Sequence, residues 1–198
     1  MMRVIGLTGG IGTGKSTASE YLRKQGFSII DADRISREIV DPGTLLLKEL
    51  EKNFGSGIIK DDGTLDRKAL AAIVFSDKEK KSRLDGLMHG HILDEIERKI
   101  SESQSGEGRG IIVDAPLLFE TGLEKKCDQV WLITADEKLR ILRVCERDGM
   151  DPEEVRARIQ NQMADEEKKE RAHRIVDNSG SKEALLAQLA ELIEAENL

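Results

Sequence analysis

Five short runs of mostly apolar residues alternate along the chain with longer segments in which apolar residues recur every three or four positions. The runs are RVIGL, FSIID, IIVDAPLLFE, QVWLIT and HRIVDN, which begin at residues 3, 27, 111, 129 and 173. Nearly continuous apolar strands are typical of a parallel sheet that is covered by helices on both faces. The pattern therefore predicts a three-layer α/β/α domain with a parallel five-stranded sheet.

The segments between these runs predict helices, and several of them have recognisable ends. KSTASEYLRKQG begins at Lys15 and closes at Gly26, and ADRISREIV stops before the DPG turn. Asp151 and Pro152 mark the start of a charged helix that we expect to continue to about residue 172. SKEALLAQLAELIEAE predicts an amphipathic terminal helix.

The segment from Asp41 to about Glu102 has a different character, because it is almost entirely helical in pattern. One turn, Asp62-Gly63, lies between two short runs and predicts a small hairpin. The glycine- and serine-rich stretch SQSGEGRG then leads back to the third apolar run. We interpret residues 41–102 as a helical subdomain inserted into the α/β domain.

Composition narrows the possible functions. The 198 residues are 38% hydrophobic and 35% charged, with a net charge of −7. The acidic balance argues against a nucleic-acid partner, and no segment approaches the ~20 apolar residues of a membrane helix. The two cysteines lack metal-site spacing and are expected to be reduced. We expect a soluble cytoplasmic protein without a membrane or nucleic-acid partner, either monomeric or weakly associating.

The strongest chemical signal lies between the first strand and the first helix. Gly9 to Ser16 satisfies the P-loop motif G-x-x-x-x-G-K-[ST] in its proper context. Glycines let backbone N–H groups face phosphates, Lys15 reaches the terminal phosphates, and the Ser16 hydroxyl ligates Mg²⁺. The expected phosphate-binding residues are Gly10, Ile11, Gly12, Thr13, Gly14, Lys15, Ser16 and Thr17. ATP and Mg²⁺ are therefore the expected co-substrate and cofactor.

Two aspartates follow other strands of the predicted sheet. Asp114 ends an apolar run and is either a second metal ligand or a strand-end residue that caps a loop. Asp33, in the DAD sequence, follows the second strand, whose carboxyl end lies at the same edge as the P-loop. A kinase for an alcohol needs such a carboxylate to accept the hydroxyl proton. Asp33 is equally well an N-cap of the next helix, and one residue can do both.

Three arginines, Arg140, Arg143 and Arg147, share one face of a predicted helix. Arginines on a mobile helix can neutralise transition-state charge on a triphosphate and exclude water. They can equally form a solvated face that pairs with Glu137 and Glu146. Arg143 and Arg147 are the better candidates for nucleotide contact.

Together these motifs resemble the dephospho-CoA kinase family along nearly the whole chain. The segments that carry the resemblance are GLTGGIGTGKST, DADRISREIV, DGTLDRKAL, LDGLMHGHI, VDAPLLFETGL, ERDGMDPEEVRARIQNQM and VDNSGS. The resemblance implies ATP-dependent phosphorylation of the ribose 3′-hydroxyl of dephospho-CoA, the final step of coenzyme A biosynthesis. It also implies a P-loop NTPase core (residues 1–39, 105–134 and 172–198), a helical substrate domain (40–104) and a helical lid (135–171).

The resemblance also implies roles for individual residues. Asp33 is the base, Lys15 and Arg143 assist catalysis, and Ser16 and Asp114 serve the metal. The acceptor is surrounded by Asp33, Arg67, His89, Leu117, Leu118, Phe119 and Glu120. The nucleotide also meets Arg147 and, at the adenine end, Asn178, Gly180 and Ser181.

Four positions depart from the family pattern. Asp85 and Gly90 replace the usual Asn and Pro, Arg140 replaces a common Gln, and His173 replaces a common Asp. None lies in the P-loop or at Asp33. The departures therefore bear on the acceptor site and the lid and leave the reaction class unchanged.

Other P-loop proteins fit the sequence less well. A GTPase would carry an N/T-K-x-D motif and a D-x-x-G switch, whereas the third strand continues into DAPLL. A nucleoside-monophosphate kinase needs arginines rather than a carboxylate beside its phosphate acceptor, so DAD favours an alcohol. A nucleic-acid motor would need a longer chain or basic tracks.

Overall fold

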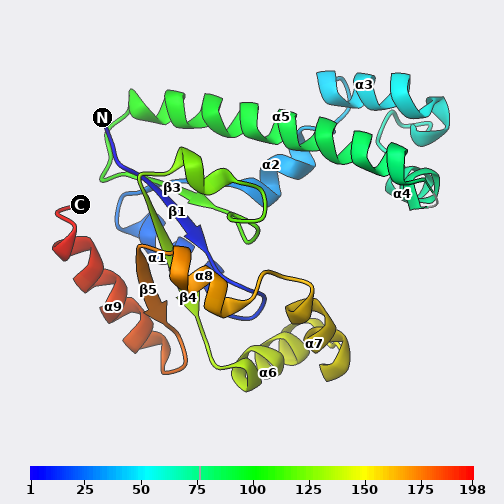
Figure 1. Ribbon diagram of the computed structural model, residues 1–198. Helices are drawn as coiled ribbons and strands as arrows, with labels where there is room; N and C mark the ends of the chain where they lie inside the picture. The colour runs from blue at the N-terminus through cyan, green and yellow to red at the C-terminus, as the bar shows by residue number, and fades with distance from the viewer. Residues whose placement is uncertain (76) are drawn as a thin grey trace. The chain divides into compact units, whose positions relative to one another are not determined.

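The computed structural model describes residues 1–75 and 77–198. Its centre is a sheet of five strands in the order β2-β3-β1-β4-β5 (Figure 1). The strands are β1 (Val4–Thr8), β2 (Ser28–Asp31), β3 (Ile111–Asp114), β4 (Gln129–Thr134) and β5 (Arg174–Asp177). β1 pairs in parallel with β3 and β4, and β4 pairs in parallel with β5. Every residue of β1 and β3 is buried, as their apolar runs predict. The α/β class with a five-stranded sheet is confirmed.

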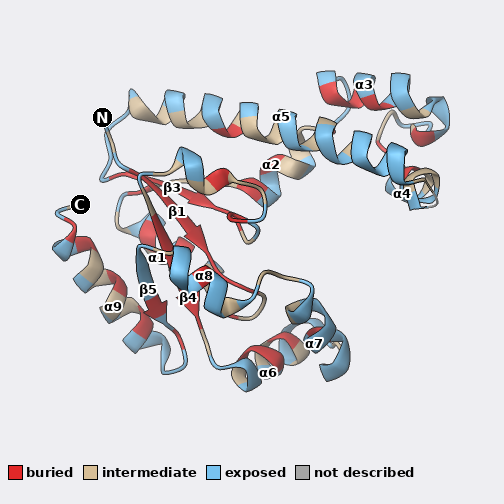
Figure 2. Ribbon diagram, in the orientation of Figure 1, coloured by how far each residue is buried: buried red, intermediate tan, exposed pale blue. Residues whose placement is uncertain are grey.

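Helices cover both faces of this sheet. α1 (Lys15–Lys24) and α9 (Lys182–Ala195) lie on one face, and α8 (Asp165–Arg171) lies on the other (Figure 1). Leu185, Leu189 and Ile193 form the buried stripe of α9, and they pack in one cluster with Leu22 of α1 and Trp131 of β4. Their spacing of four residues places them on one side of the helix. Figure 2 shows that β1, β3 and β4 are almost entirely buried, whereas β5 is mostly exposed.

The prediction of one continuous helix from Asp151 to about residue 172 is wrong. Residues 161–164 separate α7 (Pro152–Gln160) from α8. In this break the backbone N–H of Met163 donates to the Glu120 carboxylate at 3.1 Å, and the Gln162 side chain accepts from the Ile11 N–H at 3.0 Å. Partners far away in the sequence thus interrupt a segment whose local pattern is helical. The predicted start is confirmed, because the Asp151 side chain caps α7.

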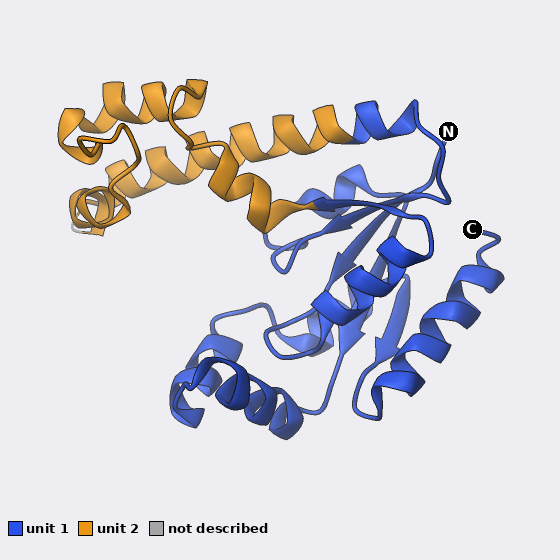
Figure 3. Ribbon diagram, turned by 180° about the vertical axis from the view of Figure 1, so that it is seen from behind, with its two compact units in different colours: residues 1–30, 100–198 blue, residues 31–99 orange. Residues whose placement is uncertain are grey.

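The chain forms two compact units, which we describe separately (Figure 3). The core unit contains Met1–Ile30 and Ile100–Leu198, and the helical unit contains Asp31–Lys99. The helical unit holds α2 (Ala32–Glu38), α3 (Leu45–Phe54), the 3₁₀ turn η1 (Ser56–Ile58), α4 (Arg67–Phe75) and most of α5 (Lys78–Gln104). It has its own apolar cluster, built around Leu46, Leu50 and Leu70. An antiparallel bridge between Ile59 and Leu65 confirms the small hairpin.

α5 is long enough to cross a membrane, but it is not apolar enough. It has 27 residues, but Ile96 is its one buried residue and charged side chains are spread along its length. Across the described part of the chain, every helix falls short of the length or apolar character that crossing a membrane requires.

The carboxyl-terminal end of α9 is fastened to the sheet by a buried acid, Glu196, which is 8% exposed. Its carboxylate accepts hydrogen bonds from Gln129 at 2.6 Å and Arg3 at 2.9 Å, and it pairs with Arg174. The Gln129 hydrogen bond, followed by the Arg174 and Arg3 contacts, lowers the pKa of Glu196 below its ordinary value of 4.5. The carboxylate therefore favours the folded state at neutral pH.

We expect Glu196→Gln to lower the free energy of unfolding at pH 7 by about 1–2 kcal/mol, because charge-assisted hydrogen bonds are lost. Because the folded pKa is depressed, this contribution is present above pH 4.5 and is lost as the pH falls below it. Urea unfolding at pH 7 and in this acid range, with the exposed Glu194→Gln as control, measures the difference. A deficit that stays constant into acid would contradict the assignment.

Candidate active site

The loop between β1 and α1 curls into a cradle whose shape depends on glycine. Gly12 and Gly14 have φ angles of 78° and 91°, in the left-handed region that favours glycine. A Cβ at Gly14 would overlap the side-chain amide nitrogen of Asn178, and a Cβ at Gly12 would lie 2.6 Å from the carbonyl oxygen of Arg140. These glycines therefore allow both the turn and the close packing around it.

Thr13 closes the cradle from within, because its N–H and its hydroxyl both donate to the Gly10 carbonyl, at 3.2 and 2.9 Å. α1 follows at once, with Gly14 as its N-cap and no side chain capping its first turn. The first N–H groups of a helix have no intrahelical acceptor, and the positive end of the helix dipole favours an anion. The predicted strand, glycine loop and helix are confirmed, and their geometry is that of a phosphate-binding site.

Lys15 forms an ion pair with Asp114, the last residue of β3. The pairing follows from the sheet register, which places Asp114 beside Leu7 just before β1 enters the loop. The two side chains are only 15% and 9% exposed, so solvent screens their attraction weakly. Ser16, the next residue of α1, is exposed. This edge of the sheet therefore carries an ammonium group and a hydroxyl that can contact a phosphate, with a carboxylate beside them.

The arginine face of α6 (Glu137–Asp148) meets the cradle more closely than its sequence pattern indicates. Arg140 is 2% exposed, and its Nε donates to the Ile11 carbonyl at 2.9 Å. Arg143 donates from Nη2 to the Asn178 carbonyl at 3.0 Å, and its Nη1 is buried without an acceptor among the described residues. Arg147 is exposed and pairs with Asp148 at 2.7 Å. Among the residues that the structure describes, none of the three forms an ion pair with Glu137 or Glu146, the partners expected for a solvated face.

The segment after β5 contacts the cradle from the other side. The buried Asn178 side chain donates to the Thr13 carbonyl at 2.8 Å and so supports the loop. Ser181 caps α9 by accepting from the Ala184 N–H at 3.2 Å. A hollow of about 220 Å³ adjoins this region, and its lining is Gly14, Thr17, Arg143, Asn178, Lys182 and Leu185. The sequence did not identify Lys182 as a candidate site residue, because nothing in its pattern distinguishes it from any other residue in the first turn of a helix.

The stretch from Leu117 to Glu120 is divided between core and surface. Leu118 and Phe119 are 0% and 4% exposed, whereas Leu117 is 45% exposed. Glu120 lies 3.5 Å from the ammonium group of the buried Lys168 and also accepts from the Met163 N–H. Of these four residues, Leu117 is the apolar side chain that is open to a ligand, and Glu120 fastens the break between α7 and α8.

In the helical unit, the structure separates the two roles that the sequence left open for Asp33. Asp31 is the N-cap of α2, and its side chain accepts from the Arg34 N–H at 2.9 Å. Asp33 lies in the first turn of the helix, and its side chain is exposed. The capping alternative for Asp33 is therefore wrong, because Asp31 fills that position.

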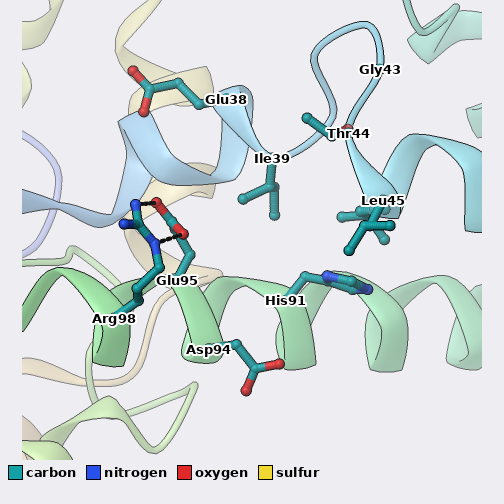
Figure 4. A pocket seen from close by; sticks show the side chains of 10 residues that line it. Glu38, Ile39, Gly43, Thr44, Leu45, His91, Asp94, Glu95 and Arg98 are labelled. Atoms are coloured by element: carbon teal, nitrogen blue, oxygen red, sulfur yellow. Dashed lines mark hydrogen bonds and ion pairs between the residues drawn. The ribbon is translucent and has the colours of Figure 1, made fainter. Parts of the chain in front are cut away.

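Two further expected acceptor residues, Arg67 and His89, are exposed at the start of α4 and on α5. His91 instead lines a hollow of about 510 Å³, and its Nε2 lies 3.1 Å from the Glu49 carboxylate. In Figure 4, Ile39 and Leu45 point toward α5, and Glu95 is held by Arg98 at 2.7 and 2.8 Å. The hollow combines an apolar wall with polar groups and suits a ligand of mixed polarity.

The structure shows where the four residues that depart from the family pattern lie and what they contact. Asp85 and Gly90 are exposed on α5, and a Cβ at Gly90 would meet no atom within 4 Å. His173, the residue before β5, accepts from the Val130 N–H at 3.1 Å through Nδ1. Arg140 is the one departure that touches the cradle, and its carboxylate partner is Asp165 at 2.5 Å.

A family model described as dephospho-CoA kinase matches residues 3–184. The dephospho-CoA kinase of Corynebacterium glutamicum is 43% identical over 192 residues, covering 97% of this chain and 98% of the relative. That of Symbiobacterium thermophilum is 42% identical over 189 residues, covering 95% and 79%. The crystal structure of TT1252 from Thermus thermophilus matches with a TM-score of 0.84 at 34% identity, covering 98% of this chain and 97% of that one.

Proposed function

The chain belongs to the dephospho-CoA kinase family, and we propose that it transfers the γ-phosphoryl group of ATP to the ribose 3′-hydroxyl of dephospho-CoA. The products are coenzyme A and ADP, and the reaction is the final step of coenzyme A biosynthesis. The observation that carries this proposal is the family match over residues 3–184, which spans the phosphate cradle, DAD and α6. Reduced cysteines and a need for ATP fit an enzyme of the cytoplasm.

The phosphates bind to the backbone N–H groups of the cradle and to Lys15. As the bond between the γ-phosphorus and the bridging oxygen of ATP breaks, negative charge grows on the leaving ADP and on the transferring group. Lys15 and Arg143 stabilise that charge, and this kind of stabilisation supplies most of the catalysis in phosphoryl transfer. The Arg143 Nη1 supports this role, because a buried donor without an acceptor is unusual and a phosphate oxygen would satisfy it.

Asp33 is the proposed base. As the acceptor oxygen bonds to phosphorus, its proton moves to the Asp33 carboxylate, so no cationic oxygen accumulates. The support is the position of Asp33 after β2 and the occupation of the N-cap by Asp31. The helical unit supplies the acceptor contacts, with Arg67, His89 and the hollow beside His91 as candidates.

Mg²⁺ is the proposed cofactor, held by Ser16 and, directly or through water, by Asp114. Among the described residues no group of three His, Cys, Asp or Glu side chains could hold a metal alone. A hydroxyl and a single carboxylate fit an ion that takes its remaining ligands from substrate phosphates and water. When bound, Mg²⁺ neutralises phosphate charge.

The test is ADP release from ATP and Mg²⁺ with and without dephospho-CoA. We expect strong stimulation by dephospho-CoA and a product with the mass of coenzyme A that a 3′-phosphatase converts back. AMP serves as the control acceptor, because a nucleoside-monophosphate kinase would phosphorylate it to ADP. Turnover that responds to AMP or to other alcohols and not to dephospho-CoA would contradict the proposal while leaving a P-loop kinase.

A further inference from the structure

Arg140 is a buried cation that touches the phosphate cradle. Its Nε donates to the Ile11 carbonyl at 2.9 Å, and its Nη1 pairs with Asp165 at 2.5 Å. A Cβ built on Gly10 would clash with its Nη2, so the guanidinium lies directly against the loop. Burying a guanidinium requires hydrogen bonds and a counter-charge, and here Ile11 and Asp165 supply both.

The other backbone group of Ile11 is also held from outside the loop. Its N–H donates to the Gln162 side chain at 3.0 Å. Both polar groups of one residue at the tip of the cradle are therefore fixed by side chains 129 and 151 residues away in the sequence. Gly12, the next residue, packs against the backbone of Arg140. The orientation of the peptide groups on either side of Ile11 thus depends on these contacts.

The two anchors of this arrangement belong to different elements. Arg140 lies in α6, whereas Gln162 is in the break between α7 and α8, and Asp165 is the first residue of α8. The Arg140–Asp165 ion pair joins α6 to the start of α8. The break is therefore linked to Ile11 twice, directly through Gln162 and indirectly through Asp165 and Arg140. This also explains the departure at Arg140, because its charge is compensated within the chain.

We propose that Arg140, Asp165 and Gln162 form a clamp that holds the tip of the phosphate cradle in its nucleotide-binding shape, with Arg140 as a positioning residue. Arg140 acts through Ile11. Without the clamp the loop samples other shapes, and apparent nucleotide affinity falls in proportion to the fraction that remains competent. The proposal rests on the proposed use of ATP, but nucleotide binding tests it without turnover.

The experiment compares Arg140→Met, Asp165→Asn and the double variant Arg140→Met/Asp165→Leu. Asp165→Asn leaves a buried guanidinium without its counter-charge and should lower Tm most. The double variant replaces both partners by apolar groups and should recover most of the wild-type Tm. It should still bind ADP about tenfold more weakly in calorimetry, because the Ile11 carbonyl is no longer held.

Two further variants provide a second test of the contacts to Ile11 and a control. Gln162→Ala should also weaken ADP binding, because it removes the other contact to Ile11. Arg156→Met, which removes an exposed arginine of α7 from its pair with Glu153, should leave both Tm and ADP affinity unchanged. Dephospho-CoA binding should be the same in all variants. If the double variant recovers wild-type ADP affinity together with Tm, the pair is only structural and the proposal is overturned.

Discussion

Replacing Lys15 by alanine is expected to lower kcat about 10²–10³-fold, which corresponds to about 3–4 kcal/mol of lost transition-state stabilisation. Among the described residues Lys15 is the ion-pair partner of Asp114, and its side chain is largely shielded from solvent. We therefore expect its charge to act on the transferring phosphate with little screening. The measurement is steady-state ADP release with saturating ATP and dephospho-CoA.

The variant also leaves Asp114 buried without its cation, so lost folding stability has to be separated from lost chemistry. Lys15→Ala alone should lower Tm, because an unpaired buried carboxylate is costly. Lys15→Ala/Asp114→Ala removes both charges and should recover Tm without recovering activity. If activity returns together with Tm, the pair is structural, and the P-loop assignment of Lys15 is wrong.

Asp33→Asn is expected to lower kcat by about 10²–10⁴-fold while ADP binds as in the wild type, because proton acceptance is the function that an amide lacks. The substitution is nearly isosteric, and the α2 cap stays with Asp31. The helix should therefore keep its stability. Single-turnover kinetics with bound ATP would measure the chemical step separately from product release.

The matched control for this experiment is Asp31→Ala, which removes the cap and leaves the Asp33 carboxylate in place. It should lower the free energy of unfolding by about 1 kcal/mol. Its kcat should fall far less than that of Asp33→Asn. Equal losses in the two variants would mean that damage to the helix terminus explains both, and Asp33 would lose its role as base.

The sheet and the cradle could be predicted because their determinants are local. Each buried strand is a continuous apolar run, and the motif from Gly9 to Ser16 lies within one strand–loop–helix unit. The break between α7 and α8 could not be predicted. It depends on hydrogen bonds of Gln162 to Ile11 and of Met163 to Glu120. The local sequence pattern contains no information about partners so far away in the chain.

The roles of the site residues also depend partly on local sequence and partly on tertiary contacts. The shared face of Arg140, Arg143 and Arg147 follows from helical spacing, but spacing does not say which of them is buried. Sequence reasoning favoured Arg143 and Arg147, whereas Arg140 has the closest contact with the cradle and Arg147 is exposed. Likewise, the sequence left Asp33 as a possible cap of the next helix, whereas the structure shows that Asp31 occupies the N-cap of α2.

By itself, the sequence determined the α/β class, the phosphate cradle and the family. The apolar runs of the strands, the periodicity of the helices and the P-loop motif each depend only on residues that are close together in the sequence. The tertiary structure decided that Lys15 meets Asp114, that Arg143 meets Asn178 and that Arg140 and Gln162 hold Ile11. These contacts join residues from 35 to 151 positions apart. Sheet register and helix packing bring such residues together, and each buried polar group is then stable only beside the partner that the fold supplies.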